Sequence, residues 1–292
     1  GNIWYTSHKS SRVGSLDPRT GIVTEYQVPL TAGAMPGTHR VAVDKNDIVW
    51  WSENWAHNLV RLDPGTGRFT VMPIETSSPL NSPGFSNFAL GPDGSIYESD
   101  DGHVNKFDPS SGVAKVVKQY PLAIGTTYDN TVSADGNFWA GGSPAGGGTQ
   151  AHLLDLRTGE MQIFNTGNRR TSPARGGFDP QGNAWFGGKG GLNSAPLVQI
   201  DAKARQLREY WPPVPYANFY EAMPDKNGEV WAGELHGGGF LRLNPKTDQW
   251  TEYLMPEPYA HNRRTWIDNS SDPIAVWYVD YQGYIVRIQP LE

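Results

Sequence analysis

The sequence predicts an all-β fold, a seven-bladed β-propeller of four-stranded antiparallel blades, and three observations support it. A phrase of an apolar residue, an aromatic residue and a third residue before a polar loop occurs seven times, every 42–47 residues. A period in the forties, with strand-like segments between turns, is typical of propeller blades. The 292 residues also include 34 Gly and 23 Pro, which fits many short strands joined by tight turns. The seven copies are Ile3-Trp4-Tyr5, Val49-Trp50-Trp51, Ile96-Tyr97-Glu98, Phe138-Trp139-Ala140, Ala184-Trp185-Phe186, Val230-Trp231-Ala232 and Val276-Trp277-Tyr278.

The second repeat shows the four strands in order. The first strand is expected at residues 40–43, the second at 48–51, the third at 59–62 and the fourth at 68–74. The turn at residues 63–67 reads Asp-Pro-Gly-Thr-Gly, and similar turns recur in other repeats. We expect these turns to be structural, because Asp caps such a turn while Gly supplies the positive φ.

The two end blades are expected to be incomplete. The first repeat lacks a first strand, and the last repeat lacks a fourth strand after residues 285–288. Two three-stranded blades leave sheet edges exposed. We therefore expect residues 1–292 to form a single domain of a longer chain, or an additional domain or partner chain to cover the edges. A ring closed by two short blades is the alternative.

Composition excludes several classes of function. The net charge of −6 and the pI of about 5.7 argue against a nucleic-acid-binding surface. The sequence has no apolar run long enough to span a bilayer, so no membrane span is expected. The absence of cysteine excludes disulfides, thiolate catalysis and cysteine-ligated metals. We expect a periplasmic or secreted protein, with a cytoplasmic location as the alternative.

A ligand site is expected at one face of the propeller. The first strand of each blade lines the central channel, so its entrance and the loop after the second strand share that face. Imidazoles titrate near neutral pH and guanidinium groups bind carboxylate or phosphate, so the site is expected to take a small polar or anionic molecule. The alternative is that each His only satisfies hydrogen bonds within its loop. The candidate ligand-binding residues are His8, Arg40, Trp55, Tyr128, Arg175, His236, His261 and Arg263.

Two segments carry a family resemblance. Residues 1–26 and the segment from Val49 to Leu62 resemble the repeat of virginiamycin B lyase, and the likeness covers nearly the whole chain. The resemblance implies a seven-bladed propeller. It also implies lyase chemistry, in which a lactone is opened by magnesium-assisted elimination, a His at a first-strand entrance acts as base, and Glu residues hold the metal.

The resemblance implies roles for single residues. His39 stands eleven residues before Trp50 and matches the family's base, and the same spacing places Tyr128, Tyr220 and Trp266 at other entrances. The candidate catalytic residues are His39, which matches the family's base, and Tyr220 and Glu221, which lie at another first-strand entrance. The implied ligands of a divalent cation, Mg²⁺ or Ca²⁺, are Glu53, Glu234 and Asp280, which leave the second strand at one offset.

Departures from the family pattern limit the functional prediction. Tyr220 and Trp266 stand where the family has its catalytic histidines, so streptogramin breakdown is not expected. The sequence instead predicts a propeller that binds a small polar or anionic molecule and cleaves it by lyase- or lactonase-type chemistry. The alternative is a non-catalytic sensor or protein-interaction module of a larger protein.

Overall fold

The computed structural model describes residues 1–76, 78–82, 84–100, 102–122, 127–142, 148–167, 171–190, 194–256, 262–280 and 282–291. In this part the chain forms 26 β-strands and two three-residue 3₁₀ helices, which confirms the all-β prediction. None of the described helical segments has the length and apolarity to cross a membrane. The chain divides into two compact units, residues 1–125 and 126–292.

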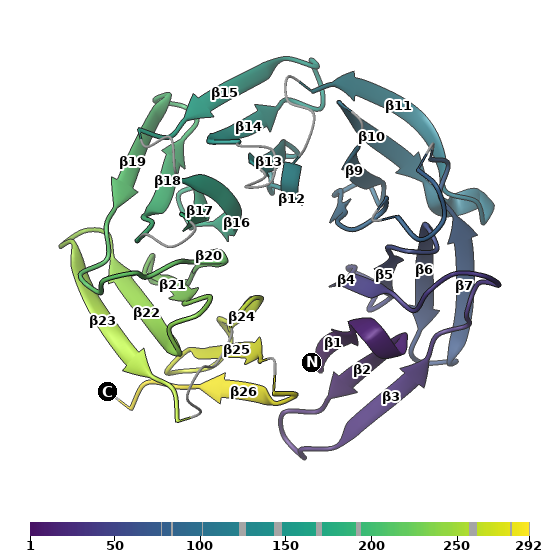
Figure 1. Ribbon diagram of the computed structural model, residues 1–292, viewed down its shortest axis with the longest axis horizontal. Helices are drawn as coiled ribbons and strands as arrows, with labels where there is room; N and C mark the ends of the chain where they lie inside the picture. The colour runs from purple at the N-terminus through teal and green to yellow at the C-terminus, as the bar shows by residue number, and fades with distance from the viewer. Residues whose placement is uncertain are drawn as a thin grey trace. The chain divides into compact units, whose positions relative to one another are not determined.

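The first unit contains three antiparallel sheets (Figure 1). The first has the order β1-β2-β3, the second β4-β5-β6-β7 and the third β8-β9-β10-β11. The elements are β1 (Ile3–Ser7), η1 (His8–Ser10), β2 (Arg12–Leu16), β3 (Val23–Gln27), β4 (Thr38–Val43), β5 (Val49–Glu53), β6 (Asn58–Asp63), β7 (Arg68–Pro73), β8 (Ala89–Leu90), β9 (Ile96–Asp100), β10 (His103–Asp108), η2 (Pro109–Ser111) and β11 (Lys115–Pro121).

The second unit continues the pattern with β12 to β15, two further four-stranded groups, and a last three-stranded sheet. The groups β16 to β19 and β20 to β23 form one eight-stranded sheet, because β16 and β20 pair in parallel. The elements are β12 (Thr127–Val132), β13 (Phe138–Gly142), β14 (Gln150–Leu154), β15 (Met161–Asn165), β16 (Ser172–Phe178), β17 (Ala184–Lys189), β18 (Leu197–Asp201), β19 (Gln206–Tyr210), β20 (Glu221–Pro224), β21 (Val230–Gly233), β22 (Gly239–Asn244), β23 (Gln249–Leu254), β24 (Thr265–Asp268), β25 (Ala275–Val279) and β26 (Ile285–Ile288).

The sheets confirm a β-propeller architecture with four-stranded antiparallel blades. Each repeated aromatic phrase lies on the second strand of a full sheet or its equivalent, such as Trp51 on β5 and Trp231 on β21. As expected, the first and last sheets, β1 to β3 and β24 to β26, have three strands in the described part of the chain. That the units form one seven-bladed ring, and hence a single domain, stays a prediction.

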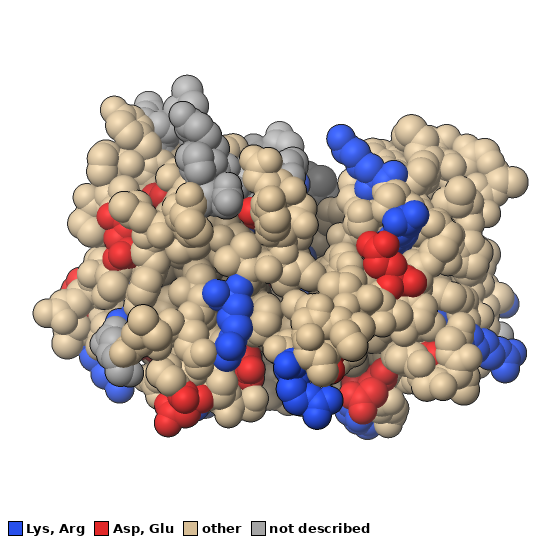
Figure 2. Space-filling model, turned by 90° about the horizontal axis from the view of Figure 1, so that it is seen from below, with Lys and Arg blue, Asp and Glu red and all other residues tan. Residues whose placement is uncertain are grey.

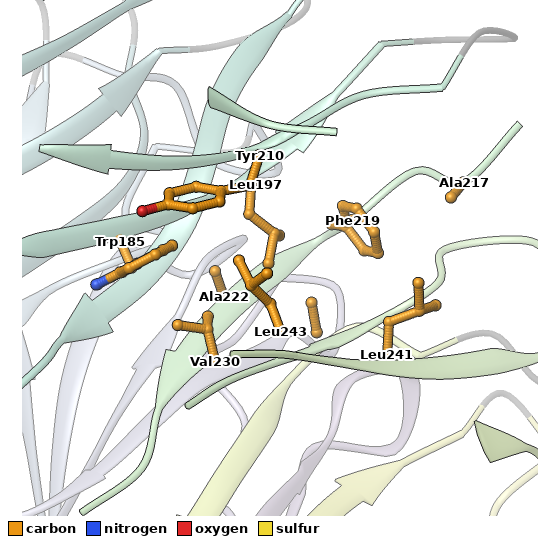
Figure 3. Close-up of a cluster of buried hydrophobic side chains, with 10 residues drawn as sticks. Trp185, Leu197, Tyr210, Ala217, Phe219, Ala222, Val230, Leu241 and Leu243 are labelled. Atoms are coloured by element: carbon orange, nitrogen blue, oxygen red, sulfur yellow. The ribbon is translucent and has the colours of Figure 1, made fainter. Parts of the chain in front are cut away.

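The core lies between neighbouring sheets. The largest fully buried side chains include Trp51, Trp185 and Trp231. Figure 3 shows one cluster, in which Trp185 of β17 and Phe219 before β20 pack with small and branched residues of the adjoining group. Removal of this apolar surface from water stabilises the sheet-on-sheet packing by about 25 cal/mol per Å².

The Asp-Pro turns are structural, as predicted. The Oδ1 atom of Asp63 accepts the backbone N–H of Gly65 at 3.0 Å, and Gly67 adopts a φ of +69°. The turns after first strands add a contact that the sequence did not suggest, because their Asp Oδ2 atoms accept the indole N–H of the tryptophan six residues later. The pairs are Trp50 with Asp44 at 2.9 Å, and Trp185 with Asp179 and Trp231 with Asp225 at 3.0 Å.

An extra residue interrupts several first strands at one equivalent place. The pairing of β4 with β5 shifts between Thr38 and Val41, that of β12 with β13 between Thr127 and Asn130, and that of β16 with β17 between Pro173 and Gly176. A bulge of this kind bends a strand and redirects its side chains, often beside a functional site. The pairs of residues that these bulges carry are His39 and Arg40, Tyr128 and Asp129, and Ala174 and Arg175.

The last sheet corrects the placement of Trp266. On β20, Met223 pairs with the repeat tryptophan of β21, Trp231, which lies eight residues later. On β24, Trp266 pairs with the repeat tryptophan of β25, Trp277, which lies eleven residues later. The turn between β24 and β25 is therefore longer, and counting back from the tryptophan places the wrong residue at the entrance. By strand register Arg263 takes the position predicted for Trp266, whose side chain is 61% exposed.

Candidate functional site

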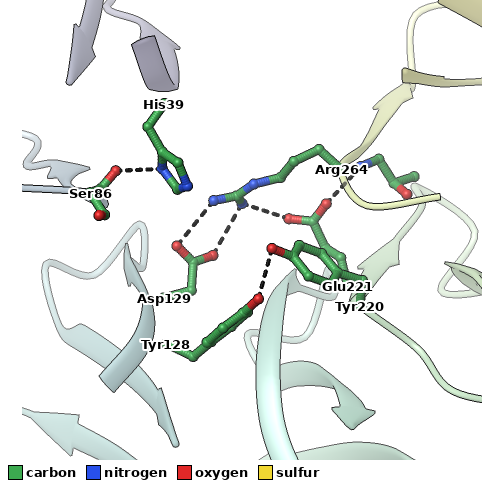
Figure 4. A network of polar contacts seen from close by, with 8 residues as sticks. His39, Ser86, Tyr128, Asp129, Tyr220, Glu221 and Arg264 are labelled. Carbon is green, nitrogen blue, oxygen red and sulfur yellow. Dashed lines mark hydrogen bonds and ion pairs between the residues drawn. The ribbon is translucent and has the colours of Figure 1, made fainter. Parts of the chain in front are cut away.

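Two tyrosines at first-strand entrances of the second unit form the centre of the candidate site. Tyr128 lies in the bulge of β12, and Tyr220 precedes β20. Their rings meet edge to face with centroids 5.6 Å apart, and the Tyr128 hydroxyl donates to the Tyr220 hydroxyl at 2.8 Å (Figure 4). Burial raises the pKa of Tyr220, although the nearby Arg175 opposes the shift, so this phenol stays protonated at neutral pH.

Three cationic side chains surround these rings. The Cζ atom of Arg175 lies 5.0 Å from the Tyr128 centroid and 4.7 Å from the Tyr220 centroid. The Nζ atom of Lys189 lies 4.5 and 5.2 Å from the same two centroids, and the Cζ atom of Arg263 lies 5.6 Å from that of Tyr220. We call these five residues the cationic cluster. Each distance lies within the range of a cation–π contact.

The depth of the three cations differs. Arg175 is 3% exposed, and its Nε atom makes no hydrogen bond to any described residue. Lys189 is partly buried and Arg263 is exposed. Burial lowers the pKa of Lys189, and the charges of Arg175 and Arg263 lower it further. The cationic cluster therefore contains one buried positive charge, on Arg175, and one that reaches solvent, on Arg263.

A second network beside the cluster occupies its carboxylates. Arg264 binds both oxygens of Asp129, at 3.1 and 3.2 Å, and Oε1 of Glu221 at 2.9 Å (Figure 4). The other Glu221 oxygen accepts the backbone N–H of Thr265 at 2.6 Å. We call Arg264, Asp129 and Glu221 the Arg264 bridge. It joins β12, β20 and the start of β24, and it uses the two acids that are adjacent in sequence to Tyr128 and Tyr220.

The charges in the bridge reinforce one another. Burial lowers the pKa of Arg264, but the negative charges of Asp129 and Glu221 outweigh this effect and raise it overall. Asp129 and Glu221 are 5% and 4% exposed. A buried carboxylate needs such a partner, because an unpaired one would cost several kcal/mol.

Glycines permit the close approach of strands at this place. A Cβ atom on Gly176 would lie 1.5 Å from the carbonyl oxygen of Trp185, and one on Gly187 would lie 2.8 Å from the backbone N of Glu221. Both positions therefore require glycine. The approach allows β16 and β20 to pair with Arg175 opposite Glu221, which places the cationic cluster against the bridge.

The first unit brings together His8, His39 and Trp55. The ring centroids of His8 and His39 lie 5.6 Å apart, and those of His8 and Trp55 lie 6.2 Å apart. His8 Nδ1 lies 2.7 Å from the carbonyl oxygen of Thr38, and His39 Nδ1 lies 2.7 Å from that of Ser86. Because a carbonyl oxygen only accepts, each Nδ1 carries the proton. In each neutral ring the Nε2 atom is then the basic one.

The three candidate metal ligands differ in their surroundings. Glu53, in the first unit, is buried and accepts the indole N–H of Trp51 at 3.0 Å, and burial raises its pKa to about 7. Glu234, in the second unit, has a pKa raised by burial and by the charge of Glu252. Asp280 accepts the backbone N–H of Tyr284 through Oδ1, while its buried Oδ2 has no described partner.

A cation at Asp280 Oδ2 would need further ligands, because the described residues contain no group of three His, Asp or Glu side chains arranged around a metal. The three candidate ligands Glu53, Glu234 and Asp280 therefore match the needs of a divalent cation only in part, and the cation stays a prediction.

The remaining candidates are His236, Arg40 and His261. His236 is exposed in the loop between β21 and β22. Arg40 lies in the bulge of β4 next to His39, and its backbone N–H donates to the Ser52 hydroxyl at 3.0 Å. His261 lies outside the described residues. On the face in Figure 2, Lys and Arg residues are interspersed with Asp and Glu residues.

Sequence reasoning missed three residues of this site. Lys189, Asp129 and Arg264 were not among the candidate ligand-binding residues, although Asp129 and Arg264 adjoin residues that were. A search for acids and cations at both bulge positions of each first strand would have found the last two. Lys189 ends β17 and has no comparable signal in the sequence.

The comparisons with known proteins identify the fold. No family model matches the chain, and no curated protein sequence does. A streptogramin B lyase structure is 20% identical, with a TM-score of 0.82 over 99% of this chain and 90% of that chain. Virginiamycin B lyase from Staphylococcus aureus is 18% identical, with a TM-score of 0.82 over 100% of this chain and 92% of that chain.

A different class of protein has a similar structure as well. The extracellular domain of a putative one-component system from B. thetaiotaomicron is 15% identical, with a TM-score of 0.73 over 99% of this chain and 39% of that chain. Identities this low establish the architecture and leave activity open. The chain therefore has a β-propeller fold of the virginiamycin B lyase-like kind.

Proposed function

We propose that the protein binds a small anionic molecule, bearing carboxylate or phosphate groups, at the cationic cluster of the second unit. The observation that carries the proposal is that Arg175, Lys189 and Arg263 all contact the ring of Tyr220. The ring of Tyr128 contacts two of these cations, Arg175 and Lys189, and each remaining ring with a cation–π contact in the described part of the chain meets one cation. Among the described residues, three cations on one ring occur only at Tyr220.

Electrostatics favour an anion over a neutral ligand. The chain has 24 Lys and Arg residues against 30 Asp and Glu residues, so a cluster of cations runs against its overall charge. The carboxylates of Asp129 and Glu221 are held by Arg264 and do not pair with Arg175 or Lys189 in the described structure. A carboxylate or phosphate would supply the acceptors that the guanidinium groups match in geometry.

Burial supports the same proposal. Arg175 is a buried charge and Lys189 is partly exposed, and desolvation strengthens the attraction of Arg175 for an entering anion. The tyrosine rings supply an apolar wall and hydroxyl groups that fix orientation. One of the similar solved structures is a catalytically inactive virginiamycin B lyase with quinupristin, so that protein of the same fold takes a small molecule.

The catalytic form of the proposal is lyase- or lactonase-type cleavage of the bound molecule with His39 as base. The hydrogen bond from Nδ1 to the Ser86 carbonyl supports this role, because it leaves Nε2 as the proton acceptor. Tyr220 would contact the ligand, and Glu221 would act as a positioning residue through Arg264. This catalytic form of the proposal assumes the predicted seven-bladed ring. His39→Gln should abolish turnover of a cleavable ligand without unfolding, and unchanged turnover would remove His39 from the mechanism.

The second candidate is a non-catalytic sensor or interaction module. The three-stranded first and last sheets favour it, because their edges are suited to a neighbouring domain or partner chain. The similarity to an extracellular domain of a one-component system also supports it, together with a periplasmic or secreted location. In this candidate the cationic cluster would still bind the anion, and the signal would be the occupancy of the site.

Titration calorimetry tests the proposal. The probes are succinate and inorganic phosphate, each at constant ionic strength, with glycerol as a neutral probe. Arg175→Gln should weaken anion binding by about 2 kcal/mol, roughly thirtyfold in Kd, because it removes one charged contact. The matched control is Arg208→Gln, since Arg208 lies 4.4 Å over the Tyr210 ring outside the cluster. Equal losses in the two variants, or no binding of either anion by the wild type, would contradict the proposal.

A further inference from the structure

We propose that Lys189 is a reactive amine that forms an imine with anionic carbonyl compounds, of which 2-oxo acids are the simplest class. This inference rests on the proposed function, because the cationic cluster must first hold the carboxylate. It goes beyond anion binding by assigning a covalent step to one residue of the site.

The position of Lys189 separates it from an ordinary surface lysine. The side chain leaves the end of β17 and brings Nζ to 3.3 Å from the Tyr128 hydroxyl. Both Tyr128 and Tyr220 rings lie beside it, and the described ion pairs do not include it. Lys106, by contrast, pairs with Asp93 at 2.8 Å. The amine of Lys189 thus faces aromatic rings and a hydroxyl group, and no carboxylate among the described residues forms an ion pair with it.

The charged groups around Lys189 favour its neutral form. Burial lowers its pKa, and the positive charges of Arg175 and Arg263 lower it further, although Tyr220 opposes them. The acids that face this region, Asp129 and Glu221, are bound to Arg264. A lysine in a desolvated site next to other cations is a recognised form of activated nucleophile.

The step balances without any further reactant. Unprotonated Lys189 attacks the carbonyl carbon of the oxo acid, and the C–N bond forms as the carbonyl oxygen becomes a hydroxyl group. That hydroxyl takes up a proton and leaves as water, while the nitrogen loses its remaining protons to give the neutral imine. Arg175 would hold the carboxylate, and the Tyr128 hydroxyl, 3.3 Å from the amine, would pass protons to and from it.

Reductive trapping tests the inference. Folded protein is incubated with pyruvate and cyanoborohydride, and the reduced adduct is located by intact mass and peptide mapping. We expect one adduct per chain, at Lys189, lost in Lys189→Arg and retained in Lys118→Arg. Lys118 is a matched control because its Nζ lies 4.3 Å over the Tyr120 ring, outside the cluster. Acetone, which lacks a carboxylate, should give less adduct at Lys189 than pyruvate does.

The outcomes separate this inference from the proposed function. Adducts spread over exposed lysines without enrichment at Lys189 would overturn the inference, even where succinate binds in calorimetry and Arg175→Gln weakens that binding. Absence of succinate binding would instead overturn the proposed function. In Arg175→Gln the adduct at Lys189 should decrease at neutral pH, because both the carboxylate contact and one neighbouring charge are lost. An undiminished adduct in that variant would also contradict the inference.

Discussion

Replacement of Arg175 by Met should stabilise the protein in the absence of ligand. Arg175 is 3% exposed and forms no ion pair with a described residue. Burial of one charge costs several kcal/mol. The two ring contacts, at 5.0 and 4.7 Å, offset about 1–4 kcal/mol of this cost. Repulsion from Lys189 and Arg263 adds to the part of the burial cost that the ring contacts do not offset.

Methionine keeps most of the apolar contact with the rings and removes the charge. We therefore expect Arg175→Met to raise the free energy of unfolding by about 1–2 kcal/mol. Each kcal/mol raises the Tm by about 2–4 °C for a domain of this size. The assay is urea and thermal denaturation in a buffer free of multivalent anions, because a bound anion would stabilise the wild type.

The matched control is Arg208→Met, since Arg208 also lies over a tyrosine ring but pairs with Asp248 at 2.8 Å on the surface. We expect this change to alter stability by less than about 1 kcal/mol, as exposed ion pairs contribute little. If Arg175→Met proves less stable than the wild type, then Arg175 supports the fold and its burial is no evidence for a ligand site.

Three further predictions concern buried charges. Arg264→Gln should destabilise the protein by about 3–5 kcal/mol in urea denaturation, because Asp129 and Glu221 would be left buried without a cation; a loss below 1 kcal/mol would contradict the role of the bridge. Burial raises the folded-state pKa of Glu53 to about 7, so its contribution to stability is present below pH 4.5 and is lost as the pH rises through 7. The free energy of unfolding should fall by about 3 kcal/mol over this range, and Glu53→Gln should remove this pH dependence. Burial lowers the pKa of His152, on β14, to about 4, so its contribution to stability is present above pH 6.5 and falls by about 3 kcal/mol as the pH drops to 4. If the free energies of unfolding of the wild type and of His152→Gln differ by the same amount at every pH, this prediction is wrong.

The sequence was sufficient to predict the strands because their signals are local. Alternating apolar positions and turn residues recur within each repeat, and β5 and β6 begin within one residue of their expected starts. The Asp-Pro turns were also interpreted correctly, since the Asp63 carboxylate caps its turn within two residues. Such features depend on neighbours along the chain and not on the packing of distant parts.

The site was less predictable because partner choice is long-range. Arg264 and Asp129 are 135 residues apart, and nothing in the sequence indicates that this arginine holds two acids while Arg263 contacts Tyr220. Counting from the tryptophans failed in the last sheet because its first turn is longer, so Trp266 was placed where Arg263 lies. The bulges that redirect the entrance residues are a property of strand pairing and become visible only in the structure.

Thermal denaturation with and without succinate, at constant ionic strength, tests the anion site most directly. A ligand that binds only the folded state stabilises it by about 2.7 kcal/mol at a hundred times its Kd. Succinate should raise the Tm of the wild type, and it should raise that of Arg175→Met much less. An equal rise in both proteins, or a rise in neither, would contradict the assignment of the cationic cluster as an anion-binding site.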